Sequence, residues 1–102
     1  ERAARLGAQW LPELERMGRG CSVVSDVRGA GLMFGIGFHT SEGPANRESH
    51  PAARFVSAAR EQGLLVNGPR DGAVTLAPPL NILDADLSLG MEVVARALQS
   101  TH

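Results

Sequence analysis

The stretch that most constrains the fold runs from Asp26 to Phe38, with the sequence DVRGAGLMFGIGF. In its second half large apolar residues alternate with smaller ones, and strict alternation is typical of a β-strand. The larger set comprises Leu32, Phe34, Ile36 and Phe38, and the opposite set comprises Met33, Gly35 and Gly37. We therefore expect a strand over 31–38 whose larger face anchors the core. Glycine in a strand often marks close approach of another group, so we expect the glycine face to lie under something from outside the chain.

A valine-rich segment, 21–27, precedes this strand, and the short connection predicts an antiparallel hairpin with its turn at 28–31. Arg28 would lie in that turn, where a guanidinium could bind a carboxylate, although most loop arginines are only solvated. The glycines do not predict a dinucleotide-binding loop, because Phe34 stands where that motif requires glycine and a strand follows in place of a helix.

Three helices are expected outside the hairpin. An apolar stripe indicates one over 1–18, with a kink or a restart at Pro12. A second over 51–62 would be capped by Ser49 or His50 and end at Gly63. A third follows residue 83, with Asp84 as its cap.

Two short strands are expected between the second and third helices, at 64–66 and 73–77, with a turn over 67–72; residues 40–49 are polar and predict a loop. This order of elements predicts an α+β fold in two layers. The fold would be a small antiparallel sheet of three to four strands with helices packed on one face. At 102 residues the chain predicts one domain, and the uncovered sheet face would meet water, a partner or another domain.

Composition excludes several classes of function. A formal net charge of −1 gives no electrostatic basis for binding nucleic acid or an anionic membrane. No apolar run has the length of a membrane span. The single cysteine, Cys21, allows no internal disulfide, which fits a reducing compartment such as the cytoplasm. The histidines and Cys21 share no metal-ligand spacing and no nucleophilic triad is indicated, so we expect neither a metal site nor a catalytic residue.

All ten basic residues are arginine, and lysine is missing. The chain therefore cannot supply a side-chain amine for a Schiff base. Since it opens in a helix-like pattern, we expect it to be part of a longer protein without its own active site. The alternative is a free-standing α+β module that binds a partner or a regulatory ligand.

Three blocks, in this order, resemble a known family: DVRGAGLMFGIGF at 26–38, EQGLLVN at 61–67 and VTLAPPLNILDADLSLGMEVVARAL at 74–98. They are similar to the C-terminal small domain of class III, fold-type-I aminotransferases that depend on pyridoxal phosphate. This group includes the acetylornithine, ornithine and ω-amino-acid aminotransferases. The resemblance covers nearly the whole chain, so it implies that residues 1–102 form that small domain.

The resemblance also implies how the parent enzyme works. A large domain outside this chain would hold pyridoxal 5'-phosphate, including the Schiff-base lysine, and this chain would be inactive alone. The parent would be a cytoplasmic homodimer that moves an amino group from an amine or amino acid to a 2-oxo acid. The small domain would pack on the large one and close one side of the substrate pocket.

One position departs from the family pattern. Many relatives carry an arginine three residues before the Pro-Pro pair, where it clamps a substrate carboxylate. This chain has Thr75 there, and a hydroxyl cannot supply a charged fork. The parent would then take carboxylates through another arginine, with Arg70 as the candidate, or favour ω-amines, or be a divergent relative. Thr75 and Arg70 are the predicted substrate-binding residues.

Overall fold

The computed structural model describes residues 2–39, 50–64, 66–70, 72–79 and 81–101. The polar loop predicted at 40–49 lies outside these residues. In chain order the elements are α1 (Arg2–Arg19), β1 (Val24–Ala30), β2 (Met33–Phe38), α2 (Pro51–Glu61), β3 (Asn67–Arg70), β4 (Ala73–Leu76) and α3 (Asp84–Gln99). No described helix has both the length and the apolar character needed to span a membrane.

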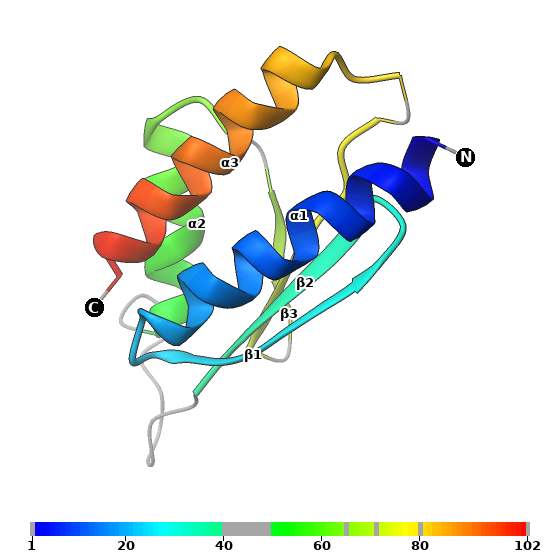
Figure 1. Ribbon diagram of the computed structural model, residues 1–102. Coiled ribbons are helices and arrows are strands. Elements are labelled where there is room, and N and C mark those ends of the chain that lie inside the picture. The colour runs from blue at the N-terminus through cyan, green and yellow to red at the C-terminus, as the bar shows by residue number, and fades with distance from the viewer. Residues whose placement is uncertain (1, 40–49, 65, 71, 80, 102) are drawn as a thin grey trace.

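The four strands form one antiparallel sheet in the order β1-β2-β4-β3. Figure 1 shows the three helices gathered on one side of this sheet, with α1 lying along the β1–β2 hairpin. The predicted two-layer α+β fold is therefore confirmed.

The core lies between the sheet and the helices, and β2 runs through its centre. Phe34 and Ile36 are 0% exposed, and Leu32 and Phe38 are also buried, which confirms the face predicted from the alternation. The ring of Phe38 packs against that of Phe55 from α2, with centroids 5.6 Å apart.

The hairpin turn lies further along the chain than predicted. Strand β1 continues through Ala30, which pairs with Met33, so the turn consists of residues 31 and 32. Gly31 adopts a φ of +58°, a conformation that favours glycine and places the reversal here. The prediction of a turn at 28–31 was wrong, and Arg28 lies within β1.

Side chains of this chain cover the glycines of β2. A Cβ on Gly37 would lie 2.1 Å from Oδ1 of Asp26, and one on Gly35 would lie 3.8 Å from Nε of Arg28. Because β1 supplies both neighbours, no group from outside the chain is needed to explain why glycine stands at these two positions.

Two helix ends match the predictions and one does not. His50 caps α2 by accepting a hydrogen bond from the backbone N–H of Ala52 at 3.1 Å. Gly63 follows α2 with a φ of +87°, as expected of a left-handed terminator. For α3, Leu83 occupies the cap position without a side-chain hydrogen bond, and Asp84 is the first helical residue. The prediction that Asp84 is the cap was wrong.

Other boundaries also differ from the sequence predictions. Helix α1 continues through Pro12 as one element, so no restart occurs there. The strand predicted at 64–66 lies instead at Asn67–Arg70, in part of the predicted turn. Its register is irregular and Gly68 adopts a φ of +121°, which explains why the sequence looks like a turn.

Candidate functional site

The sheet brings residues far apart in sequence into one row across its strands. Gly35 in β2 pairs with Arg28 on one side and with Thr75 on the other, and Thr75 pairs in turn with Asn67 of β3. Directly paired residues place their side chains on the same face of a sheet. Arg28, Thr75 and Asn67 therefore share the face opposite the helices, with a gap at Gly35.

Arg28 holds a defined position in this row. Its Nε lies 3.0 Å from Oδ2 of Asp26, which is on the same strand and the same face. Its Nε and one terminal nitrogen each lie 3.8 Å from where a Cβ on Gly35 would be. The guanidinium therefore lies over Gly35, the residue that pairs with Thr75 on its other side.

A shallow hollow surrounds this gap. Its lining comes from β1, β2 and β4 and comprises Arg28, Gly29, Ala30, Met33, Phe34, Gly35 and Thr75. Arg28 is its one ionisable lining group among the described residues. The hollow thus offers a cation and a hydroxyl to a ligand, but no acid or base suited to proton transfer near neutral pH.

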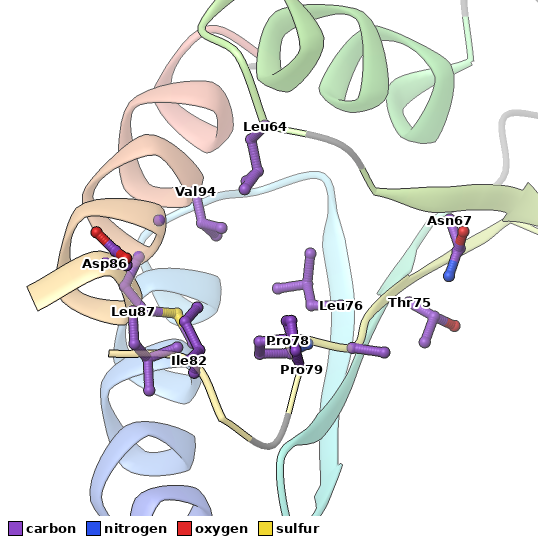
Figure 2. Close-up of a pocket in the computed structure, with 13 residues that line it drawn as sticks. Leu64, Asn67, Thr75, Leu76, Pro78, Pro79, Ile82, Asp86, Leu87 and Val94 are labelled. Atoms are coloured by element: carbon purple, nitrogen blue, oxygen red, sulfur yellow. The ribbon is translucent and has the colours of Figure 1, made fainter. Parts of the chain in front are cut away.

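A second concave feature lies between the end of β4 and α3. This pocket encloses about 220 Å³. Figure 2 shows apolar side chains facing one another across it: Leu64, Leu76, Pro78, Pro79, Ile82, Leu87 and Val94. Asp86 is its single ionisable group among the described lining residues, and it is exposed. The pocket suits apolar groups and does not favour an anion.

Thr75 lines both the hollow and the pocket. In Figure 2 Thr75 and Asn67 lie to one side of the apolar side chains, and the Thr75 hydroxyl is directed away from them. The predicted residue Thr75 is therefore where the polar face meets the apolar pocket. Among the described residues, no group of three His, Cys, Asp or Glu side chains is placed to hold a metal ion.

The structure locates the second predicted residue, Arg70, only through its backbone in β3, which pairs with Ala73 of β4. Its side chain lies outside what the structure describes. Sequence reasoning did not select Asn67, and it placed Arg28 in a turn. The missed signal was Gly31: a reversal there aligns Arg28 with Gly35, and so with Thr75.

The class-III aminotransferase family model matches residues 1–98. The chain belongs to this family. An acetylornithine aminotransferase from Methanothermobacter thermautotrophicus is 33% identical over 98 residues, which are 96% of this chain and 23% of the relative. A leucine/methionine racemase from Thermococcus litoralis is 31% identical over 96% of this chain and 22% of the relative.

The fold of this class-III aminotransferase chain is also similar to that of solved aminotransferase structures. An ornithine aminotransferase from Plasmodium yoelii superposes with a TM-score of 0.83 and 27% identity, over 100% of this chain and 25% of the other. The chain thus spans about a quarter of the length of the relatives that it matches.

Proposed function

We propose that this chain is the C-terminal small domain of a pyridoxal-phosphate-dependent aminotransferase, and that it forms one wall of the substrate pocket. The match to the class-III aminotransferase family over residues 1–98 carries this proposal. The parent enzyme would move an amino group from an amine or amino acid to a 2-oxo acid.

The residues of this chain do not themselves fit the cofactor. No lysine is present to react with the cofactor aldehyde, and the pocket beside α3 presents apolar groups and Asp86 where a phosphate would need cations. We therefore assign cofactor binding to a large domain outside these 102 residues, and we expect the isolated chain to be inactive.

The contribution of this chain would be to bind and orient the substrate. Thr75 can donate or accept a hydrogen bond, and the amide of Asn67 can do both. Their shared row on the sheet face opposite the helices would place them against the substrate when this face packs on the large domain. Arg70, on the neighbouring strand, stays a prediction as a substrate-binding residue.

We further propose that the parent is a cytoplasmic homodimer. The buried free thiol of Cys21 is compatible with a reducing compartment.

Amino acids related to ornithine are the first donors to test, because ornithine and acetylornithine aminotransferases are among the relatives.

The complete reading frame that contains this chain provides the test. The protein would be purified with pyridoxal phosphate and given 2-oxoglutarate with ornithine, N-acetylornithine, leucine or methionine in turn. We expect glutamate to form with at least one donor. Chiral separation of the leucine and methionine samples would be run in parallel, since a racemase is also among the relatives. Racemisation without glutamate formation would contradict the proposed amino-group transfer.

A further inference from the structure

We propose that Arg28 binds the substrate carboxylate in this enzyme, reaching across Gly35 to the position beside Thr75. This inference rests on the proposed function, because it assigns a substrate group to the same face of the sheet. Arg28 lies in β1, whereas Thr75, the position where many relatives carry arginine, lies in β4.

The register supplies the geometry. Arg28 and Thr75 both pair with Gly35, so they flank one residue that has no side chain. Adjacent strands are about 4.8 Å apart, which separates the backbones of β1 and β4 by roughly 10 Å. A larger residue at position 35 would occupy this space, whereas glycine leaves it to the Arg28 side chain. The Arg28 guanidinium, 3.8 Å from where a Gly35 Cβ would be, already lies over it.

Asp26 orients the guanidinium without using all of its donors. The ion pair is made at Nε, 3.0 Å from Oδ2 of Asp26. A guanidinium has five N–H donors, so its terminal nitrogens can still form the two-pronged contact that matches a carboxylate. A carboxylate held there would lie next to the Thr75 hydroxyl, which can donate a further hydrogen bond.

The charge balance favours a carboxylate over a phosphate. The hollow contains one cation among its described lining residues, and Asp26 lies beside that cation. Because Asp26 already pairs with Arg28, a bound carboxylate adds one negative charge to the site, whereas a phosphate dianion would add two and be repelled more strongly by Asp26. The ligand that fits is thus an amino acid or oxo acid that binds through one carboxylate.

The experiment uses the complete enzyme with its cofactor and compares Arg28→Met with the wild type. Donors would be ornithine and 1,4-diaminobutane, which differ by one carboxylate. Glutarate binding would be measured by calorimetry as a readout independent of turnover. We expect the KM for ornithine and the Kd for glutarate to rise about 10- to 100-fold, the range of a lost charge-assisted hydrogen bond. With the 2-oxo acid saturating, the kcat/KM for 1,4-diaminobutane should change less than about twofold, since that donor lacks the group that Arg28 binds.

Three further variants sharpen the result. Arg60→Met removes an equal charge from an exposed position on α2 and should leave the kinetic constants for both donors unchanged. Arg28→Lys keeps the charge without the fork and should give an intermediate loss. Arg28→Met/Thr75→Arg places a guanidinium on the other side of Gly35 and should restore much of the affinity for ornithine. Thermal unfolding would confirm that each variant is folded.

The outcomes separate this inference from the proposed function. Three results would each overturn the role of Arg28. They are an equal fall in kcat/KM with both donors, a glutarate Kd that is unchanged in Arg28→Met, and no glutarate binding to the wild type. An enzyme that binds glutarate through Arg28 but transfers no amino group would instead overturn the proposed function and leave the carboxylate site standing.

Discussion

At the scale of single residues, Leu83 occupies a position for which a leucine is poorly suited. It stands at the cap of α3 with φ −70° and ψ 145°, and its side chain makes no capping hydrogen bond. It is also 67% exposed, so it contributes little to the core. The start of α3 is held instead by Arg2, which lies 2.9 Å from Oδ1 of Asp84 and also bonds the carbonyl oxygen of Ile82.

Replacing this cap should stabilise the protein. Leu83→Ser supplies an oxygen that can accept from a backbone N–H in the first turn of α3, which is worth about 1 kcal/mol in the free energy of unfolding. The matched control is Leu89→Ser, another exposed leucine within the same helix, which should lower stability by about 0.5 kcal/mol or less. Urea denaturation measures both. A gain at position 89 equal to that at position 83 would show that reduced surface hydrophobicity, and not capping, is responsible.

At the scale of elements, α1 lies so close to the hairpin that it tolerates no side chain at Gly7. A Cβ there would lie 2.1 Å from the carbonyl oxygen of Gly31. That oxygen belongs to the turn backbone and cannot move aside as the end of a flexible side chain could. The same turn sets the register that aligns Arg28 with Thr75, so this contact links helix packing to the candidate site.

Gly7→Ala should therefore destabilise the protein by about 1–3 kcal/mol, the usual cost of overpacking, despite the better helix propensity of alanine. Gly90→Ala in α3 makes the same chemical change where the added Cβ would meet Leu64 at an ordinary 3.8 Å. We expect this control to gain about 0.5–1 kcal/mol, because helical glycine is unfavourable. Thermal or urea unfolding of the two variants would test the difference in sign. Stabilisation by Gly7→Ala would mean that α1 does not pack tightly on the turn.

Local patterns in the sequence predicted the parts of this fold that depend on neighbouring residues. The alternation around Phe34 predicted the buried face of β2, and Pro51 with Gly63 predicted the ends of α2 because their backbone preferences are intrinsic. The segment beginning Asn-Gly-Pro at 67–69 was misread as a turn. Its strand depends on pairing with β4, a tertiary interaction that overrides local propensity.

The candidate site was predictable only in part for the same reason. Thr75 was selected because it departs from a family motif, which a linear comparison reveals. Arg28 and Asn67 come from two strands that both precede Thr75 in sequence, and only the register of the sheet brings the three residues into one row. A one-residue error in the turn reverses which face each side chain occupies, so the misplaced turn concealed the row.

At the scale of the whole molecule, the proposed division of roles between this chain and a large domain outside it is itself testable. The chain has a core of its own: Leu6 and Leu14 of α1 pack with Phe55 of α2 and Val94 of α3. It carries no lysine. A folded chain without lysine should differ from the complete enzyme because it cannot attach pyridoxal phosphate covalently through a side chain.

Covalent attachment of the cofactor can be measured by reduction with borohydride in the presence of pyridoxal phosphate, followed by peptide mapping with mass spectrometry. In the complete enzyme we expect a pyridoxyl group on one lysine, outside these 102 residues. The isolated chain, with circular dichroism confirming that it is folded, should carry no side-chain adduct and catalyse no amino-group transfer. Any label at its N-terminal amine should form equally in denatured chain, because that amine needs no folded site. If the folded chain transferred amino groups without the larger domain, the cofactor-binding role that we assign to that domain would be wrong.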